Sequence, residues 1–163
     1  MSRDALIVGI NQYQNLPNLT AAAKDAEGIA HILETYGDFR VRRLPEIVAD
    51  QRPKIGQQSL VSAQQLENSL VRLLLPKGDH IPEAIFFYFS GHGLQREIGV
   101  REGYLATSDT QVDTSNSSLS LSWLRRLIRH SPVRQIVIIL DCCHSGEFLS
   151  LKDEAWQGSD GQS

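Results

Sequence analysis

Buried strands are predicted where apolar residues follow one another without interruption. Three segments have this pattern, "ALIVGI" (5–10), "AIFFYF" (84–89) and "IVIIL" (136–140). Such runs are typical of strands covered on both faces, as in a parallel sheet. The segment "FRVRRL" (39–44) instead alternates apolar and basic residues, which indicates an edge strand.

Helices are predicted between these strands from apolar positions at helical spacing. The first runs from Thr20, a candidate N-cap, to Gly37, a candidate stop. The second begins at a capping-box pattern formed by Ser62 and Gln65 and stops near Pro76. Its expected inward residues are Ala63, Leu66, Leu70, Val71 and Leu74. The third helix stops before Pro132, and its expected inward residues are Trp123, Leu124, Leu127 and Ile128.

Polar segments connect these elements. The segment 49–58 contains Pro53 and Gly56, and 108–120 is rich in Ser, Thr and Asp, so both are expected to be exposed loops. The segment 99–106 is expected to form a short hairpin. Strands that alternate with helices favour right-handed crossovers and a parallel sheet with helices on both faces. The carboxyl ends of the strands then share one rim, where open α/β sheets bind ligands.

Composition narrows the class of protein. A chain of 163 residues fits one domain, which we expect over 1–150, followed by a polar tail or linker over 151–163. The net charge of −3 gives no footprint for nucleic acid, so the clustered arginines are expected to be solvated. Because no apolar run approaches the roughly 18 residues of a membrane span and the amino terminus has no signal pattern, a cytoplasmic protein is expected.

Reactive side chains follow two of the buried strands. "SGHG" comes directly after 84–89, and "DCCHSG" comes directly after 136–140. The two cysteines are adjacent and cannot easily bridge each other, which indicates free thiols. A cysteine thiol becomes a good nucleophile when a histidine acts as its base. A zinc site is disfavoured because Cys, Cys and His in direct succession do not have the spacing of zinc ligands.

These two motifs carry a family resemblance. "YFSGHG" and "DCCHSG", with Cys143 51 positions after His92, resemble the caspase-like clan of cysteine peptidases, and within it the metacaspases and orthocaspases. The likeness extends over nearly the whole chain, from "ALIVGINQY" through "AAAKDAEGIAHIL". It implies a caspase-like three-layer α/β/α fold with a mostly parallel central sheet, and cysteine endopeptidase activity.

The resemblance also implies roles for individual residues. His92 and Cys143 correspond to the catalytic dyad, and the backbone amides of Gly93 and Cys143 correspond to the oxyanion hole. Cys142 stands where metacaspases commonly have serine, so it is expected to be a small neighbour and not the nucleophile. The dyad needs no orienting carboxylate. No metal or cofactor is expected.

Substrate preference follows from the same resemblance. Asp25, Ser90 and Asp141 match the positions of an acidic S1 pocket for Arg or Lys. Two carboxylates suit a cationic side chain, whereas a preference for aspartate would need arginines. Asp25 has a second interpretation, because an acid in the first turn of a helix stabilises the helix dipole. The chain departs from the family pattern at Ala22, where a cysteine is usual.

Calcium activation is not expected. The family's calcium site uses aspartate clusters, and the matching positions here offer Asp109, Asp113 and Ser150. Because Ca²⁺ takes about six to eight oxygen ligands, this set predicts a weak site at most. Calcium-independent orthocaspases are therefore the closer analogy.

The chain resembles only the large, p20-like segment of such domains. The strands of the small, p10-like segment are expected to be missing, which implies a truncated chain, a cleaved fragment with a partner segment, or an unusually short variant. An uncovered last strand would expose backbone donors and acceptors. The alternative to an active endopeptidase is a catalytically silent caspase-like module that acts in assembly or signalling. The expected partners of an active form are proteins or peptides with a basic P1 residue, without nucleic acid or membrane.

Overall fold

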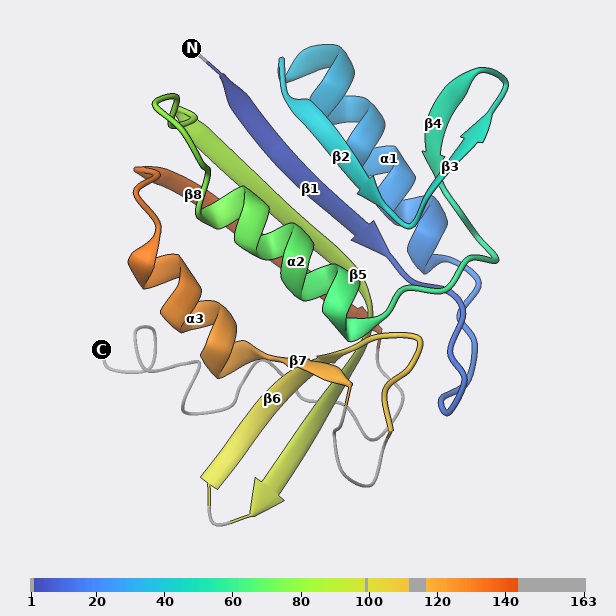
Figure 1. Cartoon of the computed structure of the whole chain (residues 1–163). Coiled ribbons are helices and arrows are strands. Elements are labelled where there is room, and N and C mark those ends of the chain that lie inside the picture. Colours follow the sequence, from blue (N-terminus) through green and yellow to red (C-terminus); the bar gives the residue numbers. More distant parts are fainter. Residues whose placement is uncertain (1, 99, 112–116, 144–163) are drawn as a thin grey trace, which may run out of the picture.

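The fold is built on four parallel strands. A computed structural model describes residues 2–98, 100–111 and 117–143. In it, β1 (Arg3–Gly9) pairs in parallel with β2 (Arg40–Leu44) and with β5 (Ala84–Ile98), and β8 (Gln135–Cys143) pairs in parallel with β5. Figure 1 shows these strands side by side in the order β2-β1-β5-β8. The predicted parallel sheet and its β2 edge are confirmed.

Both motif-bearing strands run further than predicted. β5 continues through the "SGHG" segment, and its far half turns to pair antiparallel with β6 (Val100–Ala106), which in turn pairs with β7 (Ser118–Ser120). β8 likewise continues to Cys143. The motifs were expected to follow the ends of the buried strands, but their residues lie within β5 and β8 because the strands continue to find backbone partners there. The hairpin expected over 99–106 is longer and includes the end of β5.

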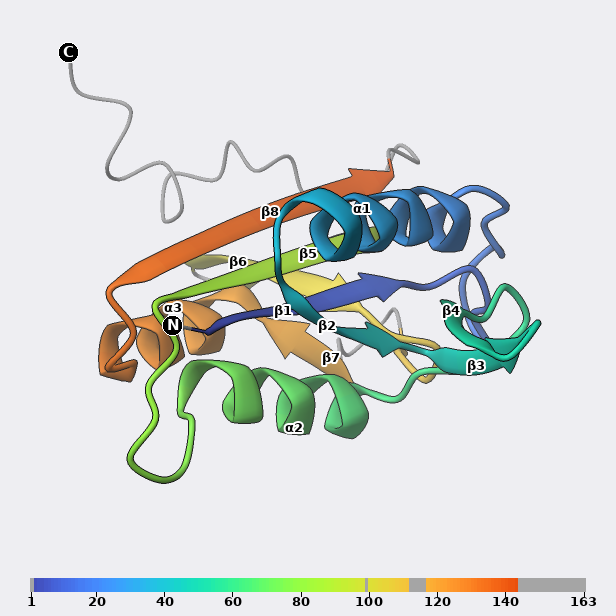
Figure 2. The same cartoon turned by 90° about the horizontal axis from the view of Figure 1, so that it is seen from above.

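Helices cover the two faces of the sheet. α1 (Ala22–Tyr36) lies on one face, and α2 (Ala63–Leu74) and α3 (Leu121–His130) lie on the other (Figure 2). Side chains of β1 alternate accordingly, since Ala5 and Ile7 pack with α1 residues whereas Leu6 and Val8 join the larger core with α2 and α3. This is the predicted three-layer α/β/α arrangement. Among the described residues, no helix is both long and apolar enough to span a membrane.

The helix ends agree with the sequence in part. The capping box of α2 is present, with Ser62 and Gln65 bonded reciprocally, and Gly37 ends α1 as expected. Thr20 is not the N-cap of α1. That position is Ala21, and the Asn11 side chain instead accepts a hydrogen bond of 2.9 Å from the Ala23 N–H. On α2, Val71 is exposed, and Leu73 is buried in its place.

The segment 49–58 is not simply a loop. It lies largely in a hairpin formed by β3 (Glu46–Ala49) and β4 (Arg52–Ile55), with Asp50 and Gln51 at the turn at positive φ. A two-residue turn of this kind matches the twist of the paired strands. Pro53 is tolerated because the hairpin has only two strands, so a missing backbone donor can face outward.

The described part of the segment 108–120, residues 108–111 and 117–120, is also less exposed than predicted. Thr107, Ser108 and Thr110 are buried, and Ser108 Oγ accepts a hydrogen bond of 2.8 Å from the Val61 N–H just before α2. Their hydroxyl groups bond to the backbone and to each other, which compensates the loss of water. Small polar residues therefore form part of the packed structure. Composition alone does not distinguish such a buried polar segment from an exposed loop.

Candidate active site

The two motifs meet at the carboxyl end of the sheet. In the parallel pairing of β5 with β8, Ser90 is opposite Asp141 and His92 is opposite Cys143. β1 reaches the same rim, since Gly9 is opposite Ser90 and the Ile10 N–H donates to the Ser90 carbonyl at 3.0 Å. The sheet therefore brings together residues from three strands that are far apart in the sequence.

His92 is held by the segment that follows β1. The residue is 1% exposed, and its backbone N–H donates a hydrogen bond of 2.9 Å to the Tyr13 hydroxyl. The Tyr13 ring lies against the imidazole at a centroid distance of 4.5 Å. The ring nitrogen Nε2 lies 2.7 Å from the carbonyl oxygen of Pro17. Sequence reasoning missed Tyr13 and Pro17, because they lie in a polar segment with no motif of its own.

These contacts determine the protonation of His92. A carbonyl oxygen only accepts hydrogen bonds, so Nε2 carries the proton in the neutral ring and Nδ1 is the basic atom. Burial lowers the pKa of His92 below its ordinary value of 6.5, and the bond to the Pro17 carbonyl offsets part of this effect. The imidazole is therefore neutral at pH 7. A neutral ring can take a proton from a thiol.

The two adjacent cysteines are not equivalent. A Cβ placed on Gly93 would lie 3.1 Å from the Cys142 sulfur, so Cys142 lies on the same face of the sheet as Gly93. The Cys142 side chain also packs against the main core. Because side chains alternate along a strand, His92 points to the face opposite Gly93. Cys142 is thus placed away from the imidazole. The Cys143 side chain lies outside the described residues.

Acidic residues lie near the rim beside Tyr88. The buried Tyr88 hydroxyl donates a hydrogen bond of 3.0 Å to Oδ2 of the exposed Asp141. The pKa of Tyr88 is raised, first by burial and then by Asp141, with a smaller contribution from the charge of Asp25. Tyr88 therefore remains protonated and keeps donating to Asp141. Asp141 therefore contacts the Tyr88 hydroxyl directly, and the charge of Asp25 also acts on this hydroxyl. Tyr88 is a further residue that sequence reasoning missed.

Close packing of α1 on β1 fixes the position of Asp25. Asp25 is exposed in the first turn of α1. A Cβ on Gly9 would lie 2.7 Å from both the Ala22 carbonyl oxygen and the Ala26 Cβ, so only glycine allows this approach. Ser90 is also buried at this rim, opposite Gly9 in the strand pairing. The three residues Asp25, Ser90 and Asp141 thus come from α1, β5 and β8.

The expected calcium positions give no cluster of ligands in the described part. The Asp109 carboxylate accepts hydrogen bonds from the Ala63 N–H at 3.0 Å and from Thr107 Oγ1 at 2.6 Å, which ties the 107–110 turn to the start of α2. Asp113 and Ser150 lie outside the described residues. No group of three or more His, Cys, Asp or Glu residues suited to a metal occurs among those that are described.

Comparison with known proteins identifies the family. The caspase domain model matches residues 2–162. The chain belongs to the caspase domain family. Metacaspase-1 of Candida glabrata is 27% identical over 156 residues, and Metacaspase-3 of Trypanosoma cruzi is 26% identical over 163 residues. The predicted family resemblance is confirmed.

The comparisons also show how much of each relative this caspase domain covers. It accounts for 38% of the C. glabrata protein and 41% of the T. cruzi protein, although the matches include 91% and 90% of this chain. A crystal structure of a protein from Geobacter sulfurreducens has a similar fold, with a TM-score of 0.62 at 19% identity over 90% of this chain and 52% of that one. The chain therefore spans well under half the length of these curated relatives.

Proposed function

We propose that this caspase domain is the catalytic, p20-like part, over 1–150, of a cysteine endopeptidase with Cys143 as nucleophile and His92 as its base. The observation that carries the proposal is the pairing of His92 with Cys143 across β5 and β8, together with an imidazole held neutral with its proton on Nε2. The position of Cys142 on the other face supports Cys143 over its neighbour.

The mechanism follows from these roles. His92 Nδ1 takes the proton of the Cys143 thiol while the sulfur attacks the carbonyl carbon of the scissile peptide. The backbone amides of Gly93 and Cys143 donate hydrogen bonds to the developing oxyanion. When the tetrahedral intermediate collapses, the imidazolium gives its proton to the leaving amine and a thioester remains. The neutral ring then takes a proton from a water molecule, whose oxygen attacks the thioester carbon. The C–S bond breaks, the carboxylic acid product leaves, and the imidazolium of His92 returns its proton to the Cys143 thiolate.

The proposed substrates have Arg or Lys at P1. Three observations support this preference: Asp141 accepts a hydrogen bond from Tyr88, the charge of Asp25 acts on the same hydroxyl, and the buried Ser90 adds a hydroxyl group. A guanidinium between two carboxylates makes charge-assisted hydrogen bonds, and its planar shape suits two acceptors better than an ammonium does. Arg is therefore expected to be preferred over Lys. A calcium requirement is not part of this proposal.

A p10-like segment is the proposed partner within the catalytic domain. Among the described residues, β8 pairs only with β5, and Val137 and Ile139 on it are 45% and 42% exposed. Apolar side chains on an uncovered strand favour a further strand or helix. The longer curated relatives are consistent with such a segment.

Covalent labelling tests the nucleophile. A peptidyl-arginine chloromethyl ketone is incubated with the complete catalytic domain, and the modified residue is located by mass spectrometry. We expect modification at Cys143, no modification in Cys143→Ala, strongly reduced modification in His92→Ala, and near-normal modification in Cys142→Ser. Modification of Cys142, or a folded domain that no such reagent labels, would contradict the dyad. The latter result would favour a catalytically silent module.

Specificity is tested separately with a fluorogenic peptide series that differs only at P1. Asp141→Ala is expected to lower kcat/KM for Arg substrates at least ~tenfold, the effect of about 1.4 kcal/mol of transition-state binding. The matched control is Asp79→Ala, a change of an exposed aspartate in the connection between α2 and β5. Unchanged Arg preference in Asp141→Ala, or cleavage mainly after Asp, would exclude the proposed pocket while leaving the dyad intact.

A further inference from the structure

A positively charged groove lies between the β2 edge and α2, away from the rim that carries His92. One part of it is a pocket of about 240 Å³ lined by β1 and β2 residues together with Ser69, Arg72 and Leu73 of α2. A wider part of about 740 Å³ continues past Arg72 to Lys77 and His80. The start of β1 lines both parts, so the groove lies toward the amino ends of the parallel strands.

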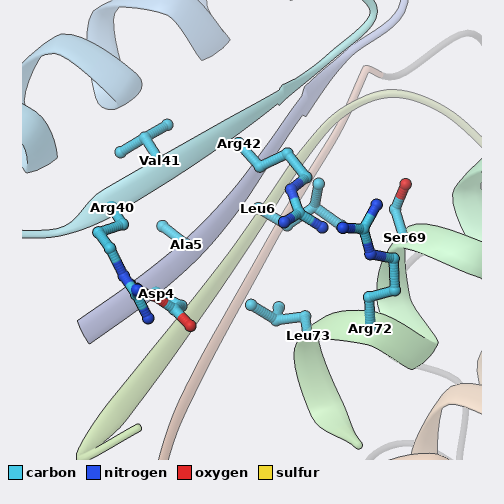
Figure 3. Close-up of a pocket in the computed structure, with 9 residues that line it drawn as sticks. All are labelled: Asp4, Ala5, Leu6, Arg40, Val41, Arg42, Ser69, Arg72 and Leu73. Carbon is cyan, nitrogen blue, oxygen red and sulfur yellow. Dashed lines mark hydrogen bonds and ion pairs between the residues drawn. The ribbon is translucent and has the colours of Figure 1, made fainter. Parts of the chain in front are cut away.

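Two arginines from different elements converge in this groove. Figure 3 shows the guanidinium groups of Arg42, on β2, and Arg72, on α2, pointing toward one another beside Ser69. Arg40 is partly neutralised by Asp4, whose Oδ1 lies 2.7 Å from Arg40 Nε. Within the described structure, neither Arg42 nor Arg72 has an ion pair. Two like charges brought together in this way favour an anionic ligand between them.

The groove borders an edge strand. In the described part of the sheet, β2 pairs only with β1, which leaves its outer backbone groups available. Side chains of β2 alternate between the faces, since Arg43 bonds to Glu27 and Glu34 of α1 while Arg40 and Arg42 line the groove on the α2 side. A strand added at this edge would place every second side chain over the groove.

We propose that this groove binds an acidic peptide segment in an extended conformation, which adds to the sheet beside β2 and directs alternate carboxylates toward Arg42 and Arg72. Backbone pairing at the edge supplies affinity, and the arginines select the charge of the ligand. A second copy of the chain fits poorly, because two β2 strands side by side would bring arginines against arginines. A small free anion would use the arginines but not the strand edge. The proposal is independent of the peptidase activity.

Fluorescence anisotropy with the 163-residue chain tests this proposal. The probe is a labelled heptapeptide with Glu at alternate positions and Val between them. We expect saturable binding that weakens as the salt concentration rises. Binding is expected to be at least about fivefold weaker when Lys replaces Glu in the peptide. A similar loss is expected when Pro replaces Val, since Pro removes backbone hydrogen-bond donors. Equal binding of the Lys peptide, or competition by inorganic phosphate at the concentration of the acidic peptide, would overturn the proposal.

Variants locate the peptide. The double variant R42Q/R72Q is expected to weaken binding at least about tenfold, while R126Q, which changes an exposed arginine on α3, leaves it unchanged. Amide hydrogen exchange of the complex is expected to show added protection in β2 and not in β8. Equal losses in both variants, protection confined to β8, or a concentration-dependent dimer that R42Q/R72Q abolishes would contradict an acidic-peptide groove.

Discussion

The Nε2 atom of His92 lies 2.7 Å from the carbonyl oxygen of Pro17. This single contact assigns the neutral tautomer of the imidazole, because the carbonyl cannot donate a proton. It also shows that the backbone carbonyl of Pro17, in the segment after β1, holds the imidazole ring. The implication of the family resemblance, that the dyad needs no orienting carboxylate, stays a prediction.

Titration of His92 is the first prediction. Burial lowers the pKa of His92, so the pKa in the folded protein is expected to be below 6.5. At pH values above this folded pKa the ring is neutral and its one proton is expected on Nε2. The unfolded state then binds the proton more readily than the folded state, so the stability contributed by neutral His92 is fully present above pH 6.5 and is lost as pH falls. Two-dimensional ¹H–¹⁵N NMR of the imidazole measures both properties. A pKa above 6.5, or a proton on Nδ1, would contradict the assignment.

Tyr13→Phe tests the support of His92 by the segment after β1. The substitution leaves the buried His92 N–H without its acceptor, which is expected to cost about 1–3 kcal/mol of unfolding free energy in urea titrations. The control is Tyr36→Phe, because Tyr36 is 81% exposed and the change should stay within about 0.5 kcal/mol. Equal effects of the two substitutions would mean that the hydroxyl of Tyr13 does not support His92.

Gly9→Ala tests the approach of α1 to β1. The added methyl group would lie 2.7 Å from the Ala22 carbonyl oxygen, so α1 must move and the variant should lose about 1–3 kcal/mol of stability. Gly28→Ala, a glycine-to-alanine change within α1 itself, is the matched control, because a Cβ there meets nothing within 4 Å. It is expected to gain about 0.5–1 kcal/mol from helix propensity. Thermal or urea unfolding of both variants measures the difference in stability between them. A loss of stability in Gly28→Ala similar to that in Gly9→Ala would contradict the close approach of α1 to β1.

Arg43→Ala tests the ion-pair cluster between β2 and α1. The Arg43 side chain is 3% exposed and lies 3.0 Å from Glu27 Oε1 and 2.7 Å from Glu34 Oε1. Glu27 also accepts a hydrogen bond from the Ile55 N–H in β4, so the cluster holds the β3–β4 hairpin. Its removal leaves two carboxylates without their cation and should cost about 3 kcal/mol.

The control for this cluster is Arg40→Ala, whose side chain is 73% exposed and pairs with Asp4 on the surface. Its loss should stay below about 1 kcal/mol. Arg43 lowers the pKa of Glu34 below its ordinary value of 4.5, so the contribution of this pair is present above pH 4.5 and disappears as pH falls through the lower folded value. Urea titrations at pH 7 and pH 3 measure both effects, and similar costs for the two arginine variants would contradict the cluster.

The sequence by itself determined the family, the parallel strands and the order of helices. Uninterrupted apolar runs and helical spacing are local properties of the chain, and burial on both faces of a sheet requires them. It also placed both motifs on the carboxyl rim, because all parallel strands end on the same side. Local patterns gave wrong predictions where residues distant in the sequence pack against or bond to a segment. The β3–β4 hairpin and the buried 107–110 turn are examples, since both were expected to be exposed loops.

Only the tertiary structure decided what surrounds the motif residues. Tyr13 and Pro17 contact His92 although they lie 79 and 75 residues before it in the sequence. Tyr88 contacts Asp141 across a separation of 53 residues. The pairing of β5 with β8 also separated Cys142 from the face of His92, although the two cysteines are chemically identical neighbours in the sequence. The protonation of a histidine and the face of a cysteine depend on distances between strands, and sequence spacing does not determine those distances.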